Sequence, residues 1–155
     1  MMTESSYNSN LKLLLDSSIA FTNADTSYRL RKLRSVRDWV HLCIQKHDHE
    51  VGEITVVFCS DEYLLDMNRE HLDHDYYTDI ITFDYTENKL VSGDLFISLD
   101  RVKDNAKGGG TTLNDELHRV IIHGILHLMG YKDKTPADQT VMRSKEDYCL
   151  TLRTF

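Results

Sequence analysis

The chain has 155 residues, of which 41% are hydrophobic and 28% are charged, a composition that fits one folded globular domain and excludes an extended disordered protein. Its 25 acidic and 18 basic side chains give a formal net charge of −7, which argues against a protein that binds DNA or other nucleic acid through its overall charge. No signal-peptide pattern and no apolar run of membrane-spanning length is present, so we expect a cytoplasmic protein that contacts no membrane.

The first part of the chain predicts a strand, a helix, a second strand and a second helix. Residues 1–12 are polar and are expected to be poorly ordered, and a short strand is predicted around Ile19–Phe21. From Tyr28 to about Lys46 apolar residues recur at helical spacing, which predicts an amphipathic helix. The β-branched, apolar run Ile54–Cys59 is typical of a buried strand, and Ser60 then stands where the cap of a following helix belongs.

Two further strands, a turn between them and a short helix are predicted in the middle of the chain. The strands are Ile80–Tyr85 and Leu95–Leu99, and residues 86–89 can form the turn, so the two strands are expected to be neighbours in the sheet. A helix is expected from Asp100 to about Lys107. It ends at the three consecutive glycines of residues 108–110, which form a flexible break.

The strongest helical pattern follows this break. Thr112 or Asn114 can cap its start, and Gly130 stands where a left-handed residue ends a helix. A proline is well placed to open a last helix over about Thr135–Leu152. Strands and helices mix without strict alternation, so the predicted fold is α+β. We expect a single domain over residues 1–155, with a small mixed β-sheet packed against helices.

Two histidines and an aspartate form a candidate metal site at the end of the strongest helix. His123 and His127 are four residues apart, so they lie on one helix face and their imidazoles can converge on one ion. Gly130 lets the chain reverse, and the carboxylate of Asp133 can then return as a third ligand. Three protein ligands and one open position are the usual pattern of a catalytic zinc site. The sequence therefore predicts a metal-dependent hydrolase in which these three residues act through a water that the ion activates.

The residue after the first histidine decides against one class of zinc enzyme. In peptidases with a His-Glu-x-x-His helix, the glutamate at that position is the general base. Here the position is Gly124, which has no side chain, so a metallopeptidase of this mechanism is disfavoured. A pair of histidines at this spacing also occurs by chance on helices. The glycine turn and the carboxylate that follows it favour a metal site over such a chance pair.

Several segments resemble those of the YbeY family, the bacterial single-domain metal-dependent endoribonucleases of ribosomal RNA maturation. The segment His123–Tyr131 matches the family's signature, and Asn68 begins the family's central segment. Thr78–Phe83 looks like its Thr-[Asp/Asn]-Val-Leu-Ser-Phe strand, and Gly93-Asp94 resembles the Gly-Asp before its next strand. These matches keep their order over about residues 50–150, which is most of the chain.

The resemblance implies a cytoplasmic, zinc-binding α+β domain with the metal site on a central helix and the turn after it. It implies a single-strand-specific endoribonuclease that hydrolyses phosphodiester bonds in the small-subunit precursor of ribosomal RNA. The implied partners are ribosomal RNA and small-subunit assembly factors. One Zn²⁺ ion is the implied cofactor, with another divalent metal as the alternative. Nothing in the sequence bears on the oligomeric state.

Two positions depart from the family's pattern. The usual third ligand is a histidine ten residues after the first, and here that position is Asp133. A carboxylate also binds zinc but adds a negative charge, so we expect a less acidic bound water and a shifted metal preference. The family's arginine four residues after the asparagine is expected to contact phosphate. Here that position is Leu72.

Other residues are candidates for contacts beside the ligands. Asp94 can accept a hydrogen bond from a metal-binding histidine or touch substrate, or it can simply form a turn. Thr78 and Asp79 can line the cleft or cap the entry to their strand. The basic stretch over residues 29–37 can contact RNA phosphate or form a solvated helix face. Its three candidate contacts are Arg31, Lys32 and Arg34.

Two functions from different classes follow from these observations. The first is the zinc-dependent endoribonuclease that acts in ribosomal RNA maturation and ribosome assembly. The second is a non-catalytic, metal-stabilised factor that binds RNA during ribosome assembly, which Leu72 and the acidic net charge favour. RNA cleavage by the metal-loaded protein distinguishes the two, because only the first predicts turnover.

Overall fold

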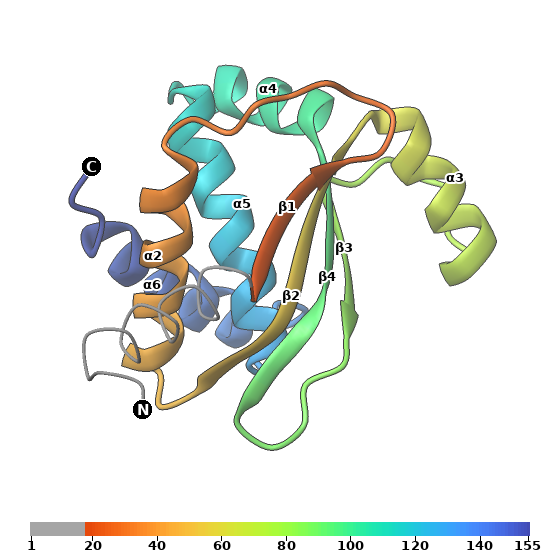
Figure 1. The fold of residues 1–155 in the computed structure, drawn as a ribbon. Helices are drawn as coiled ribbons and strands as arrows, with labels where there is room; N and C mark the ends of the chain where they lie inside the picture. Colours follow the sequence, from red (N-terminus) through yellow and green to blue (C-terminus); the bar gives the residue numbers. More distant parts are fainter. Residues whose placement is uncertain (1–17) are drawn as a thin grey trace, which may run out of the picture.

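The computed structural model describes residues 18–155, so the expectation for residues 1–12 lies outside the described part of the chain. Within it, four strands form one sheet and five helices pack around that sheet (Figure 1). The α+β prediction is confirmed. Between residues 18 and 155, no helix has both the length and the apolar character that crossing a membrane requires.

The strands form a mixed sheet. They are β1 (Ile19–Asn23), β2 (Glu50–Cys59), β3 (Ile80–Asp84) and β4 (Leu90–Ser98). Their spatial order is β1-β2-β4-β3, in which β1, β2 and β4 are parallel and β3 runs antiparallel to β4. The prediction that β3 and β4 are neighbours is confirmed. Both β2 and β4 begin earlier than predicted, because their first residues pair with each other.

Five helices connect and cover the strands. They are α2 (Leu33–Lys46), α3 (Asp61–Leu72), α4 (Leu99–Gly108), α5 (Leu113–Leu128) and α6 (Pro136–Thr151). In α3, α4, α5 and α6 the first turn is capped by a hydroxyl that accepts a hydrogen bond from a backbone N–H. The capping residues are Ser60, Ser98, Thr112 and Thr135.

The start of α2 corrects the prediction of a helix from Tyr28. The helix begins at Leu33, because Lys32 adopts a left-handed backbone conformation with φ of 53° and interrupts the helical path. Tyr28 and Leu30 still pack against the core from the preceding loop, which explains why they matched the helical spacing. Arg31 and Lys32 therefore lie before the helix.

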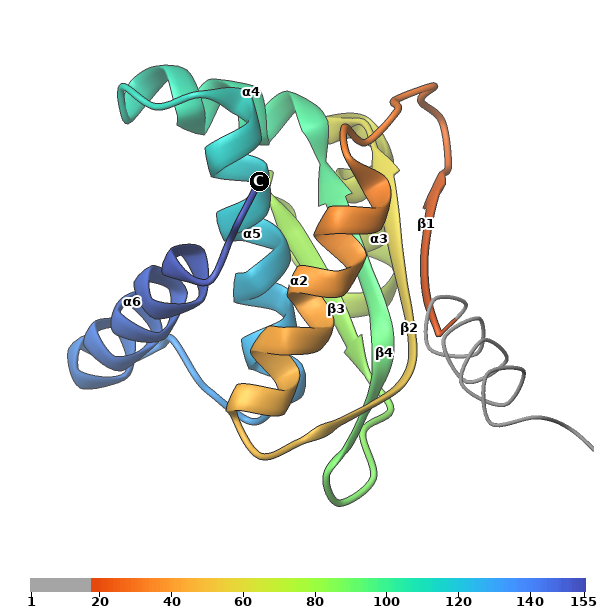
Figure 2. The ribbon, with the colours of Figure 1, turned by 60° about the vertical axis from the view of Figure 1, so that its left-hand side comes forward.

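Helices cover both faces of the sheet, and the alternation of β4 shows which helix lies on which face. The core-facing residues of β4 include Leu95, which lies against α5. The next residue, Phe96, points to the opposite face, where its ring stacks on Tyr63 of α3 at a centroid distance of 6.4 Å. Figure 2 shows α2 and α5 together on one face of the sheet, with α6 outside α5. The central helix α5 thus lies between the sheet and α6.

Candidate metal centre

The side chains of His123, His127 and Asp133 converge at the end of α5. The two Nε2 atoms lie 3.0 Å apart, and the Oδ2 atom of Asp133 lies 3.1 Å from Nε2 of His123 and 3.2 Å from Nε2 of His127. The three residues form the group within residues 18–155 whose ligand atoms lie close enough to hold one ion, all within 4.8 Å of one another. The structure therefore brings together the three residues that the sequence singles out.

This donor set fits a divalent metal ion. Two imidazole nitrogens and one carboxylate oxygen are a known ligand set of catalytic zinc sites. Ligands at about 2.0–2.1 Å from a tetrahedral ion are about 3.3 Å from one another. The separations of 3.0 to 3.2 Å between the three atoms are close to that value. The side chains are also only partly buried, so a fourth ligand can approach from solvent.

The turn after α5 brings the aspartate back to the helix. Gly130 has a positive φ of 96°, a conformation that residues with a side chain rarely adopt. Beyond it, the backbone N–H of Tyr131 donates to the carbonyl of Leu126 at 3.1 Å, which closes the helix end. The chain then runs back along the helix, and Asp133 comes level with the two histidines.

A buried glutamate of α6 contacts the first histidine from the other side. The Nδ1 atom of His123 lies 2.7 Å from Oε2 of Glu146, which is only 5% exposed. Burial opposes the charge of Glu146, but hydrogen bonds from His123 and Arg119 outweigh it and lower the pKa of this carboxyl. Burial also lowers the pKa of His123, and the hydrogen bond and charge of Glu146 reverse this, so the net shift is upward.

Sequence reasoning did not identify Glu146, although a signal was present. In the last predicted helix the spacing of Met142, Glu146 and Cys149 places one glutamate on the apolar face. All three side chains are buried in α6. A charged residue on a buried face needs a partner, and the partners here are on α5. The NH1 group of Arg119 donates to Oε1 of Glu146 at 2.9 Å.

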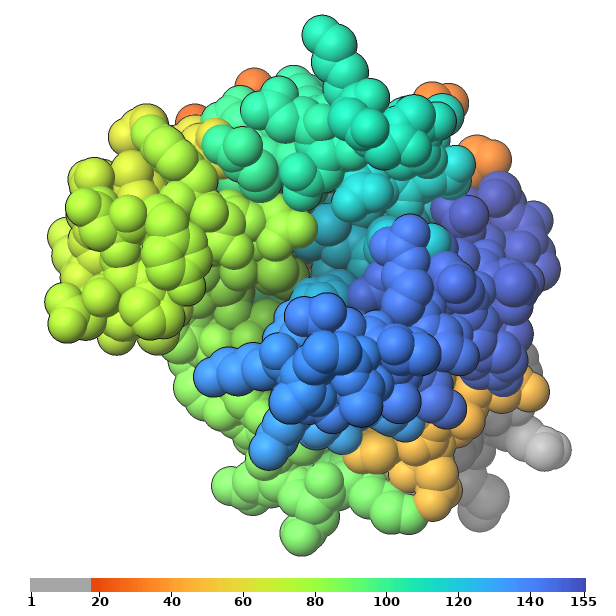
Figure 3. Space-filling view, turned by 180° about the vertical axis from the view of Figure 1, so that it is seen from behind, coloured from red at the N-terminus to blue at the C-terminus, as the bar shows by residue number. Residues whose placement is uncertain are grey.

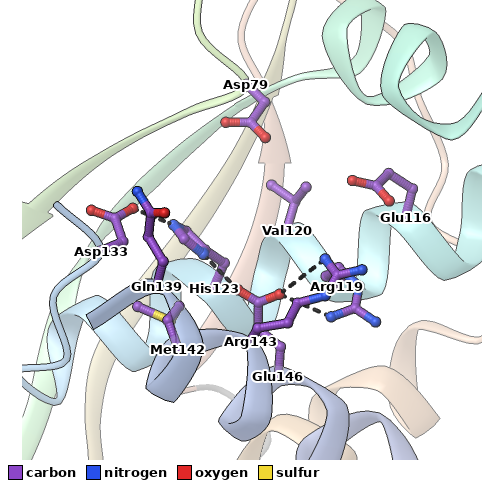
Figure 4. A pocket seen from close by; sticks show the side chains of 10 residues that line it. All are labelled: Asp79, Glu116, Arg119, Val120, His123, Asp133, Gln139, Met142, Arg143 and Glu146. Carbon is purple, nitrogen blue, oxygen red and sulfur yellow. Dashed lines mark hydrogen bonds and ion pairs between the residues drawn. The ribbon is translucent and has the colours of Figure 1, made fainter. Parts of the chain in front are cut away.

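Two of the candidate ligands, His123 and Asp133, line a pocket of about 310 Å³. Figure 3 shows a recess between the yellow-green segment around α3 and the blue α6. The close-up in Figure 4 shows Asp79 across the pocket from Glu146, with His123 between them. The polar and charged side chains that line it come from the segment before β3, from α5 and from α6 with its preceding loop; six of these are Asp79, Glu116, Arg119, His123, Asp133 and Arg143.

Two carboxyl groups of this pocket hold a proton more tightly than an exposed carboxyl does. Burial raises the pKa of Asp79, and the charge of His123 opposes that rise. Burial also raises the pKa of Glu116. The pocket therefore combines a candidate metal centre with carboxyl groups that are suited to proton exchange.

Asp94 lies away from this centre, so of the roles that the sequence left open for it, a hydrogen bond from a metal-binding histidine does not fit its position. Its neighbours Gly93 and Leu95 face Leu128 and Gly124 of α5, so Asp94 points to the opposite face of β4. There it lines a different pocket. Of the two residues before β3, Asp79 lines the pocket beside the histidines. The hydroxyl of Thr78 contacts the backbone carbonyl of Ile80 at 3.5 Å, as expected for a residue at a strand entry.

The candidate RNA contacts lie apart from the metal centre. Arg31 and Lys32 are exposed just before α2, and Arg34 is exposed in its first turn. The first two line a separate pocket with Arg153 and the start of α5. Leu72, at the position of the family's arginine, is 41% exposed at the end of α3.

The chain is similar to proteins of one family. The family described as Endoribonuclease YbeY matches residues 19–153. Endoribonuclease YbeY of Cytophaga hutchinsonii is 54% identical over 141 residues, which cover 90% of this chain and 99% of the relative. Endoribonuclease YbeY of Parabacteroides distasonis is 48% identical over 134 residues, which cover 86% of this chain and 94% of the relative.

The fold is also similar to that of a solved structure. The solution structure of TM1509 from Thermotoga maritima superposes with a TM-score of 0.65, over 86% of this chain and 87% of that one. The two sequences are 24% identical, so this likeness concerns the fold alone.

Proposed function

The chain belongs to the endoribonuclease YbeY family, and from that premise we propose that it is a metal-dependent endoribonuclease whose active site is the pocket between α5, α6 and the segment before β3. The observation that carries this proposal is the convergence of two imidazole nitrogens and one carboxylate oxygen on one point, with His123 and Asp133 of this group lining that pocket. The reaction is hydrolysis of a phosphodiester bond in RNA.

His123, His127 and Asp133 are the residues that would hold one divalent ion, and zinc is the ion that we propose for this donor set. When bound, such an ion supplies a Lewis acid that lowers the pKa of a water molecule and offsets negative charge on the reacting phosphate. The three side chains supply a net charge of −1 when both histidines are neutral, because only the aspartate is charged.

Two further side chains of the pocket have roles in this proposal. Asp79 faces the pocket and, with its raised pKa, accepts or returns a proton during hydrolysis. Arg143 is suited to contact phosphate, because its side chain is 65% exposed and the carboxylate oxygen paired with it, Oε1 of Glu146, is 3.9 Å away. Arg119 is less available, since both its NH groups already donate to carboxylates at 2.8 to 2.9 Å. Arg143 thereby supplies the phosphate contact that Leu72 cannot.

The substrate that we propose is a single-stranded or unpaired segment of the small-subunit precursor of ribosomal RNA. A recess of about 310 Å³ accepts a phosphate group only if the strand can bend into it, which paired RNA resists. We further propose that the protein acts in the cytoplasm beside small-subunit assembly factors. The relatives that carry the name Endoribonuclease YbeY support an RNA substrate.

The test compares metal-free protein, prepared with a chelator, with protein to which Zn²⁺, Mn²⁺ or Mg²⁺ has been added back. Each sample is incubated with a labelled single-stranded oligoribonucleotide, its duplex and the matching oligodeoxyribonucleotide. We expect cleavage of the single-stranded RNA after refilling with zinc, and little cleavage of the other two substrates. Cleavage that persists in the stripped protein would contradict metal dependence. Refilled protein that never cleaves RNA would instead favour the non-catalytic assembly factor.

A further inference from the structure

Glu146 is the meeting point of two side chains from α5. Its Oε2 atom lies 2.7 Å from Nδ1 of His123, and its Oε1 atom accepts a hydrogen bond from NH1 of Arg119 at 2.9 Å. Arg119 and His123 are four residues apart on α5, so they lie on the same helix face and reach the same carboxylate of α6. The side chain of Glu146 is 6% exposed, so water does not compete for these two contacts.

We propose that Glu146 is a positioning residue, held in place by Arg119, that fixes which nitrogen of His123 carries the proton. This inference rests on the proposed metal centre and deepens it. An ionised carboxylate can only accept hydrogen bonds, so the nitrogen that faces it must be Nδ1–H. In the neutral ring the other nitrogen then has a free lone pair. That nitrogen is Nε2, which lies 3.0 Å from Nε2 of His127 and 3.1 Å from Oδ2 of Asp133. Glu146 therefore presents His123 to the ion in the protonation state and orientation that binding needs.

Arg119 makes this arrangement possible, because a buried carboxylate without a countercharge is costly. The side chain of Arg119 is 19% exposed, and its second NH group donates to Asp147 at 2.8 Å. Asp147 is 59% exposed and faces solvent. The guanidinium of Arg119 thus joins two carboxylates: Glu146, which is buried and contacts His123, and Asp147, which is exposed and does not. Substitutions at these two residues can therefore be compared as test and control.

A purely structural role is the alternative, in which Glu146 only attaches α6 to α5. The two roles differ in what they predict for His123. A structural role predicts a loss of stability and no change in the tautomer of His123 or in the intrinsic zinc affinity of the folded protein. A positioning role predicts a change in both, and neither measurement involves RNA.

Glu146→Gln is the principal test, because glutamine has one oxygen for two donors. Its amide NH₂ must then face either His123 or Arg119, so the Nδ1–H tautomer of His123 loses its fixed partner. We expect the dissociation constant for Zn²⁺, measured by competition with a chromophoric chelator, to rise about 10–100-fold. The control Asp147→Asn removes the charge of the exposed partner of Arg119 and is expected to change this constant less than about twofold.

The tautomer is measured directly by ¹⁵N NMR of the metal-free protein at a pH where His123 is neutral. The measurement is made in an Asp133→Ala background, because without an ion Oδ2 of Asp133 also faces Nε2 of His123, at 3.1 Å. In this background we expect the proton on Nδ1 when Glu146 is present, and a mixture of the two tautomers when Glu146→Gln is added. The double variant Glu146→Gln/Arg119→Met removes the competing donor and leaves the amide oxygen free for His123. We therefore expect its zinc affinity to recover to within about fivefold of wild type, although it carries one more substitution.

Several outcomes would overturn the inference. These are an unchanged zinc constant in Glu146→Gln, an unchanged tautomer, or an additive loss in the double variant. If Glu146→Gln does not fold, Glu146→Asp replaces it. Aspartate keeps the charge but withdraws the oxygens by about 1.5 Å, so weaker zinc binding and a mixed tautomer are again expected. If His127→Ala binds zinc as tightly as wild type, the metal centre itself is wrong. If His127→Ala loses zinc and Glu146→Gln does not, only the present inference fails.

Discussion

Leu95 of β4 lies directly against Gly124 of α5. A Cβ atom placed on Gly124 would be 3.0 Å from both Cδ atoms of Leu95, closer than a normal van der Waals contact, and 2.7 Å from Cδ1 of Ile80. The glycine that follows His123 therefore matters for packing, and not only because it leaves the position of a peptidase general base without a side chain. Because it has no side chain, α5 approaches the sheet closely, and this sets the depth at which the two histidines stand.

Gly124→Ala is expected to destabilise the protein. Overpacking of a core typically costs about 1–3 kcal/mol, and the better helix propensity of alanine returns up to about 1 kcal/mol. We expect a net decrease of about 1 kcal/mol in the free energy of unfolding, measured by urea denaturation. Gly108→Ala is the control, since nothing lies within 4 Å of a Cβ there and no loss is expected. Equal effects of both substitutions would contradict the packing argument.

His127→Ala is expected to remove the metal and the activity together. Loss of one of three ligands leaves two side chains to hold the ion, so elemental analysis should find much less than one zinc per chain. RNA cleavage should fall at least about 100-fold, because metal stabilisation of the reacting phosphate is worth several kcal/mol. His74→Ala, at an exposed histidine outside the group, should retain both zinc and cleavage. Unchanged cleavage in His127→Ala would remove the site from the mechanism.

Asp133 is tested by two substitutions with opposite expectations. Asp133→Ala removes the third ligand and should raise the dissociation constant for zinc at least about tenfold. Asp133→His restores the ligand type that is usual in the family, and should keep one zinc per chain. A neutral ligand leaves more of the ion's charge uncompensated, so the pH of half-maximal cleavage should move downward in this variant. Equal zinc content in wild type and Asp133→Ala would end the three-ligand proposal.

Arg143→Ala tests the proposed phosphate contact. A charge-assisted hydrogen bond is worth about 1.5–3 kcal/mol, so kcat/KM for RNA should fall about 10–100-fold while zinc affinity stays near wild type. Arg143→Lys keeps the charge and should recover part of the loss. The control is Lys145→Ala, whose ammonium lies over the ring of Tyr131 at 5.8 Å and is absent from the pocket lining. A loss in Lys145→Ala equal to that in Arg143→Ala would mean that only general surface charge matters.

The stability of the metal-free protein should depend on pH through His118. Burial, with a smaller effect from the charge of Arg153, lowers the pKa of His118 to about 4, and NH1 of Arg153 donates to its Nδ1 at 2.8 Å. The unfolded value is near 6.5, so the unfolded chain takes up the proton first as the pH falls. The contribution of neutral His118 to the free energy of unfolding is therefore complete above about pH 6.5. It is lost as the pH falls toward 4, at a rate of at most about 1.4 kcal/mol per pH unit.

The measurement is urea unfolding of chelator-treated protein between pH 7.5 and pH 4.5. The control is His118→Gln, which cannot titrate in this range, so its free energy of unfolding should fall less steeply with decreasing pH. Identical slopes for the two proteins would show that His118 is not held neutral by the fold.

Much of the local structure was predictable from the sequence, because local patterns encode local structure. The strand and helix order matches the prediction, and so does the turn at Gly130. Of the two caps that the sequence allowed, Thr112 and Asn114, the structure has Thr112. The start of α2 was predicted too early, since apolar spacing reports which residues face the core and not whether the backbone between them is helical. The left-handed Lys32 leaves no mark on that spacing.

The amino-acid sequence alone determined the part of the candidate site that lies in the short segment from His123 to Asp133. His123 and His127 share a helix face because of their spacing, and Gly130 returns Asp133 to them. Their role as metal ligands stays a prediction, but their proximity follows from geometry that is local in the sequence.

Only the tertiary structure decided which distant groups surround these residues. Asp79 enters the pocket from the segment before β3 and Glu146 enters from α6, while Asp94 points to the other face of the sheet. The sequence marks Glu146 as buried, but it cannot say that His123 and Arg119 are the donors. Periodicity defines the face of an element, whereas the partner of that face depends on the strand order and on how closely α5 packs on β4.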